Sequence, residues 1–480
     1  MIRRFITTVA DHTSTCIRGR HLRRALLSSL MALGVSSATL ATTASDEHRA
    51  VILLIGDGFD DQHVTMGRNY LMGAAGELTL DTLPIRAAVQ VETVDAQGKP
   101  VYVADSANTA TTLAGGQVTE IGRVGTDRQD KDIETLLEQA AAAGYRTGIV
   151  ATASVTDATP ASFMAHVSNR GCENPEIIMG GERYGSQYPG CPDDARNNGG
   201  PGSIAEQIIA SPAHVVLGGG LKHFDYSPFD SDITLLEQAK SQGIAVATDL
   251  DSLLTSDKDA RLLGLFAPKH LPVRLRGADG RKAEAVTGSL LNKVDERLGT
   301  VEQPAPMACE PNPEFGTTPT LATLTEVALD RLSRNNDRGL FLMIESASID
   351  KQSHARNPCG SIGEIEQLEE ALAVALTYAE LHPNTLVLVT ADHAQAAQIV
   401  PEPSLFEDLP LPSYTPGKIA RIETPEGGLM AINYATTVFP SEEHTGANVP
   451  LFGNAQALGV VKPFMRQRDV YQAMRQYLGL

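Results

Sequence analysis

Carboxylates and imidazoles occur in four short segments of this 480-residue chain, and both groups are common ligands of divalent metal ions. The candidate ligands are Asp57, Glu345, Asp350, His354, Asp392, His393 and His444. Asp350 and His354 are four residues apart, a spacing that places both side chains on one face of a helical turn. Mixed carboxylate and imidazole sets suit zinc, whereas sets of oxygen ligands alone suit magnesium. Each residue alone has a structural alternative, because an Asp after a strand often caps a helix and a lone His is usually packed.

Ser106 is the candidate nucleophile. It follows Asp105 and precedes a run of small residues, 107–112, which suits the start of a helix. At a helix N-terminus, backbone N–H groups favour an alkoxide and an incoming anion. The alternative is an ordinary helix cap formed by Asp105 and Ser106. No Gly-x-Ser-x-Gly pattern surrounds Ser106, so a Ser-His-Asp hydrolase is not indicated, and a bound metal could activate the serine instead.

Arg170 is the candidate phosphate-binding residue, and it lies two residues before Cys172. A disulfide at Cys172 would fix the loop that carries Arg170. A fixed guanidinium can hold a phosphate by two hydrogen bonds. The alternative for Arg170 is an ordinary surface charge.

The chain has five cysteines, and Cys16 lies in its N-terminal segment. An even number then remains, which suggests two disulfides in an exported chain. Sequence separation favours Cys172 with Cys191 and Cys309 with Cys359. The alternative is four free or metal-bound thiols, but no Cys-x-x-Cys spacing supports it.

Residues 1–44 have the pattern of a secretory signal, in which arginines precede an apolar run, 25–40, and small residues follow it. An uncleaved membrane anchor is the alternative, although serines dilute this run and it is short for a span. Removing the six Arg and one Asp of this segment changes the formal net charge from −19 to about −24. Such an acidic protein is not expected to be a general nucleic-acid binder, and an anionic substrate would need local positive charge.

Continuous apolar runs predict the strands that must position these residues. They lie at 51–56, 147–152, 214–217, 340–345 and 385–390, with helix-like segments between them. Residues 361–381 predict an amphipathic helix, because apolar side chains recur there at spacings of three and four. This alternation predicts an α/β fold with a large, mostly parallel sheet covered by helices on both faces. Asp57, Glu345 and Asp392 would lie at the carboxyl ends of strands, where such sheets bind ligands.

The predicted domain organisation is one catalytic domain, 45–480, after the signal segment. Two ranges, 268–306 and 401–443, have weaker periodicity and scattered Pro and Gly. We expect both to be insertions in this domain, with the second forming a flap beside the site.

Six motifs occur in a characteristic order: IGDG at 55–58, DSA at 105–107, DATPA at 157–161, ESASIDKQSHARNPCG at 345–360, TADHA at 390–394 and EHTG at 443–446. In these motifs the chain resembles alkaline phosphatases of the bacterial periplasmic type. The resemblance covers nearly all of the chain after the signal segment. Two departures flank the site, Phe59-Asp60 after GDG and Asn108-Thr109 after DSA.

The resemblance implies a phosphate-monoester hydrolase in which Ser106 forms a phosphoserine intermediate and Arg170 holds the phosphate. It implies two zinc ions and one magnesium ion per subunit. One zinc would be held by Asp350, His354 and His444, the other by Asp57, Asp392 and His393, and magnesium by Asp57, Thr159 and Glu345. Asp157 matches the position of a carboxylate that lies beside the magnesium in this family. Lys351 matches the position of a lysine that reaches the phosphate through a water molecule. The resemblance also implies small phosphomonoester substrates, a homodimer, and a periplasmic or secreted protein without a membrane span in its mature form.

Three other functions are alternatives to a phosphomonoesterase. A sulfatase of the same superfold would need a modifiable residue in a Cys-x-Pro-x-Arg context, which Ser106 lacks. A phosphodiesterase would be expected to lack the third, oxygen-rich set, which here contains Thr159 and Glu345. A secreted protein that binds metal or phosphate without catalysis would not need the nucleophile.

Overall fold

The central element of the fold is a sheet of ten strands. The computed structural model describes residues 48–183, 185–402, 404–406, 408–409 and 415–480, so the predicted signal segment, 1–44, and Cys16 lie outside the described residues. Within the described residues the strand order is β21–β2–β20–β16–β1–β15–β5–β8–β10–β9. In that order the strands are Phe464–Arg466, Ile85–Gln90, Val449–Gly453, Thr385–Ala391, Arg49–Gly56, Gly339–Ser346, Arg146–Ser154, Val215–Gly219, Leu262–Leu265 and Ala245–Ala247.

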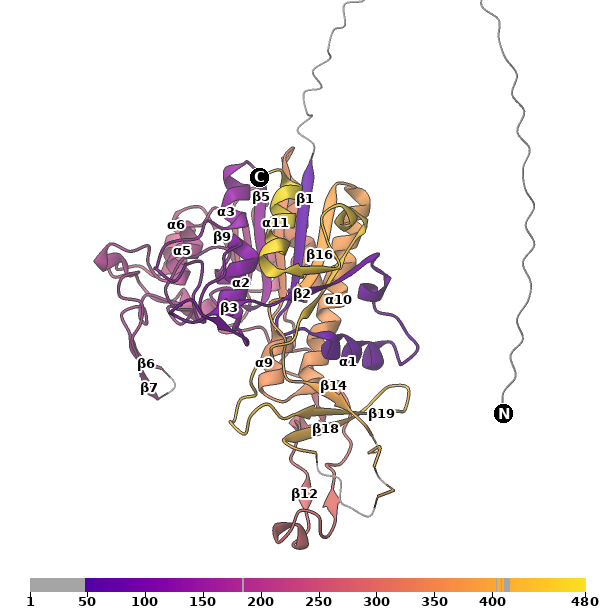
Figure 1. Ribbon diagram of the computed structural model, residues 1–480. Helices are drawn as coiled ribbons and strands as arrows, with labels where there is room; N and C mark the ends of the chain where they lie inside the picture. The colour runs from indigo at the N-terminus through magenta and orange to yellow at the C-terminus, as the bar shows by residue number, and fades with distance from the viewer. Residues whose placement is uncertain (1–47, 184, 403, 407, 410–414) are drawn as a thin grey trace, which may run out of the picture. The chain divides into compact units, whose positions relative to one another are not determined.

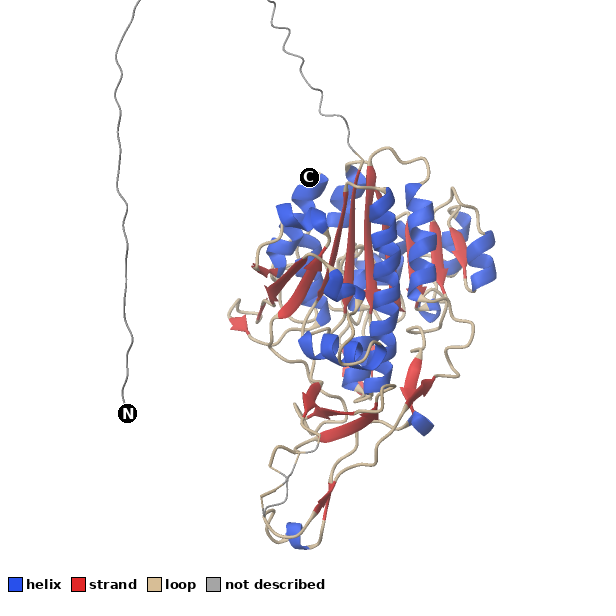
Figure 2. Cartoon of the chain, turned by 90° about the vertical axis from the view of Figure 1, so that its right-hand side faces the viewer, coloured by secondary structure: helices blue, strands red, loops and turns tan. Residues whose placement is uncertain are grey.

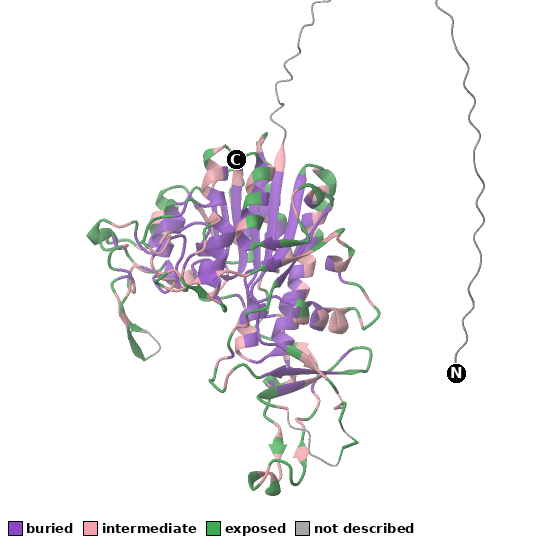
Figure 3. Ribbon diagram, viewed as in Figure 1, coloured by how far each residue is buried: buried purple, intermediate pink, exposed green. Residues whose placement is uncertain are grey.

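Most neighbouring strands of this sheet are parallel, and the five predicted strands form its middle, from β16 to β8. Within the described part of this sheet, the only antiparallel pairs are those that β20 forms with β16 and β2. Strands β1, β15 and β16 are buried over almost their whole length (Figure 3), which explains their unbroken apolar sequences. In their register, Ile55 lies opposite both Glu345 and Thr390. The carboxyl ends of the three central strands therefore lie level with one another.

Helices cover both faces of the sheet, as Figure 2 shows, so the predicted α/β class is confirmed. Helices α8 and α10 pack together on one face, and α2, α3 and α11 pack together on the other. The predicted helix at 361–381 is α10, which begins three residues earlier because Asn357 caps it and Pro358 suits its first turn. The helices are α1 Asp61–Leu71, α2 Ser106–Gly115, α3 Leu136–Ala142, α4 Ala158–Ala161, α5 Ile204–Ala210, α6 Leu235–Ser241, α7 Leu250–Thr255, α8 Leu321–Ser333, α9 Ser348–His354, α10 Pro358–Leu381 and α11 Gln467–Leu478.

Smaller sheets lie outside the central one, and the largest contains β17, β19 and β18 (Figure 1). The two ranges predicted to be insertions, 268–306 and 401–443, contact each other through an isolated bridge between Glu284 and Ile419. Their interpretation as insertions stays a prediction. The strands outside the central sheet are β3 Thr93–Val94, β4 Pro100–Val101, β6 Gly181–Arg183, β7 Ser186–Tyr188, β11 Leu275–Gly277, β12 Thr287–Gly288, β13 Val301–Glu302, β14 Cys309–Pro311, β17 Gln398–Val400, β18 Lys418–Glu423 and β19 Leu429–Tyr434.

Two disulfides join the four cysteines of the described chain, Cys172 with Cys191 and Cys309 with Cys359. This is the pairing that sequence separation predicts. The second disulfide connects β14 to the first turn of α10 and so attaches a smaller sheet to the central domain. Among the described residues, every helix is too short or too polar to cross a membrane.

Candidate active site

Three buried carboxylates mark the end of the central sheet where the predicted site lies. Asp57 follows β1, Asp392 follows β16, and Glu345 is the penultimate residue of β15. All three side chains are buried. Because β1 pairs with both of the other strands in level register, the fold gathers carboxylates that are up to 335 residues apart in sequence.

Ser106 is the first residue of α2, and its side chain faces these carboxylates. Its Oγ lies 3.0 Å from His393 Nε2 and 3.4 Å from Asp57 Oδ1. Asp105 caps the helix by accepting a hydrogen bond from the Asn108 N–H. Asp105 therefore acts as the helix cap, which leaves the Ser106 hydroxyl available to the site. Ser106 also lines a cavity of about 970 Å³.

Arg170 and Lys351 are two of the four lysines and arginines that line the same cavity. Arg170 pairs with Asp105 at 3.3 Å and with Asp157 at 3.1 Å, and Lys351 pairs with Asp157 at 2.8 Å and with Asp57 at 3.2 Å. Burial opposes ionisation of Asp157, but Lys351 and Arg170 outweigh it and hold the pKa of Asp157 well below its usual range. Burial also opposes the charge on Lys351, but Asp157 and Asp57 raise its pKa well above the usual value. Both cations therefore stay charged where an anion would bind.

The three histidines share one arrangement, in which Nδ1 faces a backbone carbonyl and Nε2 faces the site. Nδ1 of His444 lies 2.7 Å from the Ala104 carbonyl, and Nδ1 of His393 lies 3.2 Å from the Ala394 carbonyl. Nδ1 of His354 contacts the Glu442 carbonyl. When Nδ1–H donates to a carbonyl, the lone pair of Nε2 is left free for a cation. All three rings are therefore oriented as metal ligands usually are.

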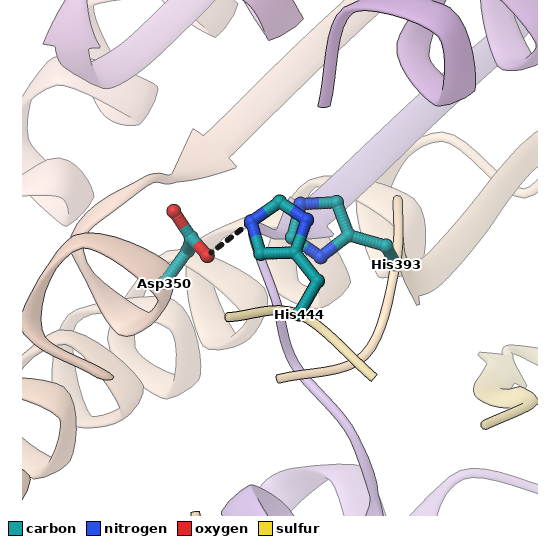
Figure 4. A group of neighbouring side chains, drawn as sticks. All are labelled: Asp350, His393 and His444. Carbon is teal, nitrogen blue, oxygen red and sulfur yellow. Dashed lines mark ion pairs between the residues drawn. The ribbon is translucent and has the colours of Figure 1, made fainter. Parts of the chain in front are cut away.

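Two groups of side chains bring their donor atoms within 4.8 Å of one another: Asp57, Asp392 and His393; and Asp350, His393 and His444. Figure 4 shows the second group, with His444 between Asp350 and the stacked ring of His393. His354 Nε2 adjoins that second group, 3.4 Å from Asp350 and 3.1 Å from His444 Nε2. His393 thus lies between the two predicted zinc sets, with its Nε2 3.3 Å from Asp57 and 3.4 Å from Asp392.

Several buried oxygens at this end of the sheet have no hydrogen-bond partner among the described residues. They are both carboxylate oxygens of Glu345, Oδ2 of Asp392 and Oγ1 of Thr159. Burial and the negative charges of Asp350 and Asp392 raise the pKa of Asp57 to about 7, and burial raises that of Asp392 to about 6. Burial also raises the pKa of Glu345 well above its usual value. Unpaired buried oxygens are costly, and bound cations would offset this cost, so the residues present fit a divalent-metal centre.

Comparison with known proteins decides the family. Residues 48–434 match the family described as Alkaline phosphatase. The chain belongs to the alkaline phosphatase family. The enzyme is therefore a metal-dependent hydrolase of phosphomonoesters, as the sequence motifs predict.

Relatives of this alkaline phosphatase match it over most of their length. The alkaline phosphatase of Escherichia coli (strain K12) is 38% identical, over 93% of this chain and 90% of that protein. A Streptomyces griseus protein named streptomycin-6-phosphate phosphatase is 39% identical, over 96% of this chain and 97% of that protein. The solved alkaline phosphatase of the Antarctic bacterium TAB5 shares the fold with a TM-score of 0.62 and 21% identity, covering 90% of this chain and 98% of that one. A variant of the TAB5 protein is described with Mg bound in its M3 site.

The structure places the predicted residues of the alkaline phosphatase site as follows. Hydrogen bonds, ion pairs and ring stacking join ten of them in one network: Ser106, Arg170, Asp57, Asp157, Asp350, Lys351, His354, Asp392, His393 and His444. Glu345 adjoins this network, because the charges of Lys351 and Asp57 act on its pKa. Thr159 is buried in α4, and its hydroxyl forms no hydrogen bond with any described residue.

Sequence reasoning missed a buried ion pair that joins two parts of the site. The Arg356 guanidinium contacts the Glu442 carboxylate and donates to the carbonyls of Phe439 and Pro440. The Glu442 N–H also donates to the His354 carbonyl at 3.0 Å. Arg356 lies two residues after His354, and Glu442 lies two residues before His444. The pair thus holds the segment that carries His444 against the end of α9, and only the proximity of each partner to a predicted ligand could have indicated it.

We expect Arg356→Ala to destabilise the enzyme by about 3–5 kcal/mol, because it leaves the Glu442 charge buried and unpaired. Urea unfolding followed by far-UV circular dichroism measures this loss of unfolding free energy, because the chain has no Trp whose fluorescence could be followed. Arg276→Ala is the matched control, because Arg276 pairs with Glu310 at the surface and such pairs contribute about 0–1 kcal/mol. Equal losses of unfolding free energy in the two variants would contradict the role of the pair.

Proposed function

We propose that this alkaline phosphatase transfers the phosphoryl group of its substrate to Ser106 and then to water. The main support for this proposal is the position of Ser106 Oγ at the start of α2, beside Asp57 and His393. Arg170 and Lys351 line the same cavity as Ser106. A helix N-terminus and two fixed cations favour a phosphate group at this place.

Three cation sites would complete the centre. One zinc would be held by Asp350, His354 and His444, a second by Asp57, Asp392 and His393, and magnesium by Asp57, Thr159 and Glu345. The orientation of the three histidine rings supports the zinc sets, and the unpartnered oxygens of Glu345 and Thr159 support the magnesium set. When bound, these cations lower the pKa of hydroxyl groups beside them and balance negative charge in the transition state.

The protein's own residues account for binding and orientation in this scheme. Arg170 holds two non-bridging oxygens of the phosphate, and its pairs with Asp105 and Asp157 keep the guanidinium in place. Deprotonated Ser106 Oγ forms a bond to phosphorus as the bond from phosphorus to the leaving-group oxygen breaks. Water then attacks phosphorus from the vacated side, which breaks the bond to Ser106 and releases inorganic phosphate. Lys351 provides positive charge near the phosphate throughout.

The substrates we propose are small phosphomonoesters, since the cavity of about 970 Å³ lies within the size range of small-molecule sites, roughly 300–1,000 Å³. We also propose that the enzyme acts in the periplasm or outside the cell, as a homodimer. The pattern of residues 1–44 and the two disulfides support export.

Chelation tests the proposed function directly. We expect EDTA to abolish p-nitrophenyl phosphate turnover and added Zn²⁺ with Mg²⁺ to restore it. Cations must displace the protons that Asp57 holds below pH about 7 and Asp392 below pH about 6, so restoration should need more Zn²⁺ at pH 6 than at pH 8.5. Initial rates against free Zn²⁺ at the two pH values measure this. Full turnover in EDTA would contradict the proposal.

A further inference from the structure

A second cavity, of about 520 Å³, adjoins the catalytic one and shares two wall residues with it, Lys351 and His354. His354 lines the catalytic cavity together with Ser106, and it also lines the second cavity. A leaving group that extends from a phosphate at Ser106 past His354 would therefore enter the second cavity, which we call the side cavity. The side cavity is large enough for a nucleoside-sized group, since small-molecule pockets begin at roughly 300 Å³.

The wall of the side cavity is positively charged. It contains Lys282, Lys351, Arg356 and Lys418, and none of its described lining residues is a carboxylate. This contrasts with the chain as a whole, whose formal net charge is −19. A cationic surface on an acidic protein is a specific feature and favours an anionic ligand.

Two of the four cations remain available to a ligand. Lys351 is paired with Asp57 and Asp157, and Arg356 is paired with Glu442. Lys282 and Lys418 are exposed, and neither forms an ion pair with any described residue. Glu284 is the acidic residue nearest to Lys282 along the chain, and it is already paired with Arg281 at 2.9 Å. The free charge of the side cavity therefore comes from Lys282 and Lys418.

The backbone holds these two lysines in place. Glu284 and Ile419 exchange two hydrogen bonds of 3.0 and 2.8 Å, which join the segment after Lys282 to the strand that begins at Lys418. The Ala283 N–H donates to the Arg356 carbonyl at 2.9 Å, which attaches the same segment to the end of α9. The two ranges predicted to be insertions thus form one wall of the side cavity, beside His354.

We propose that the side cavity is a leaving-group subsite that selects phosphomonoesters whose leaving group carries a second phosphate. Lys282 and Lys418 bind this second phosphate, and the exposed ring of Phe439 at the same wall provides an aromatic face for a nucleobase. The inference rests on the proposed function, because it requires the first phosphate to be bound at Ser106.

The test compares kcat/KM for adenosine 3′,5′-bisphosphate with kcat/KM for adenosine 5′-monophosphate, which lacks the second phosphate. We expect the wild-type enzyme to prefer the bisphosphate, and the double variant Lys282→Gln/Lys418→Gln to reduce this preference about 5- to 10-fold, since each exposed charge contributes modestly. Added salt should reduce the wild-type preference as well, because it screens exposed charges. Lys99→Gln/Lys131→Gln is the matched control, since it removes the same charge from exposed lysines outside both cavities.

Three outcomes would overturn the subsite: no wild-type preference, an unchanged preference in Lys282→Gln/Lys418→Gln, or an equal reduction in Lys99→Gln/Lys131→Gln. Turnover of p-nitrophenyl phosphate, which has no second phosphate, is followed in every variant. Persistent turnover of that substrate with no preference for the bisphosphate overturns the subsite alone. Absence of its turnover in the wild-type, metal-loaded enzyme overturns the proposed function and the subsite that depends on it.

Discussion

Ser106→Ala is expected to lower kcat/KM for p-nitrophenyl phosphate by at least about 10³-fold, which is typical when a nucleophile is removed and the rest of the site remains. The hydroxyl that would form the phosphoryl–enzyme bond is lost, whereas Arg170, Lys351 and the proposed cation sites would still bind and polarise the substrate. The remaining rate should come from direct attack of water. Steady-state kinetics on the metal-loaded variant measures the loss.

The control for this substitution is Thr112→Ala, which removes another buried hydroxyl from α2. The Thr112 hydroxyl donates to the backbone carbonyls of Asn108 and Gln117 and does not line the cavity. We expect its kcat/KM to stay within about 3-fold of the wild type, because it loses only local hydrogen bonds. If Ser106→Ala were as active as Thr112→Ala, the nucleophile would have to be another group.

Asp57→Asn is expected to have the second-largest effect, since Asp57 belongs to two of the proposed cation sets and contacts Lys351 and Ser106 as well. The substitution keeps the side chain's shape but removes its charge. We expect activity to fall by more than the roughly 10–100-fold that is usual for residues that only support metal ligands. Metal analysis should also find fewer bound cations per chain than in the wild type.

Asp61→Asn is the control for Asp57→Asn, because Asp61 is an acidic residue four positions later on the same segment. Its side chain is 70% exposed and pairs only with Arg86 among the described residues. We expect its activity and cation content to equal those of the wild type. An Asp57→Asn enzyme that kept its full cation content would exclude Asp57 as a shared ligand.

The middle of the fold was predictable because its strands are buried on both faces. β1, β15 and β16 are therefore almost entirely apolar, and the polar residue that ends each run could be recognised as a candidate for the site. The edge strand β21 and its neighbour β2 were not predicted. Both are partly exposed, so their sequences lack such a run.

The residues that support the site were less predictable than the candidate ligands. Arg356 and Glu442 are 86 residues apart, and neither lies in a pattern that indicates its partner. The same holds for His63, whose buried ring contacts Asp60 at 2.8 Å and Ser353 at 2.9 Å and so joins α1 to α9. Such pairs depend on how the chain packs in three dimensions, whereas ligand sets at strand ends follow from local sequence and the rule for parallel sheets.

Trapping the phosphorylated enzyme tests the proposed phosphoserine intermediate directly. The metal-loaded enzyme is mixed with excess phosphomonoester, quenched in acid within milliseconds to seconds, digested, and analysed by mass spectrometry. We expect a phosphate on the peptide that contains Ser106, localised to that residue and absent from Ser106→Ala. A phosphate on a different residue, or an active enzyme that carries none at any time after mixing, would contradict the proposed intermediate.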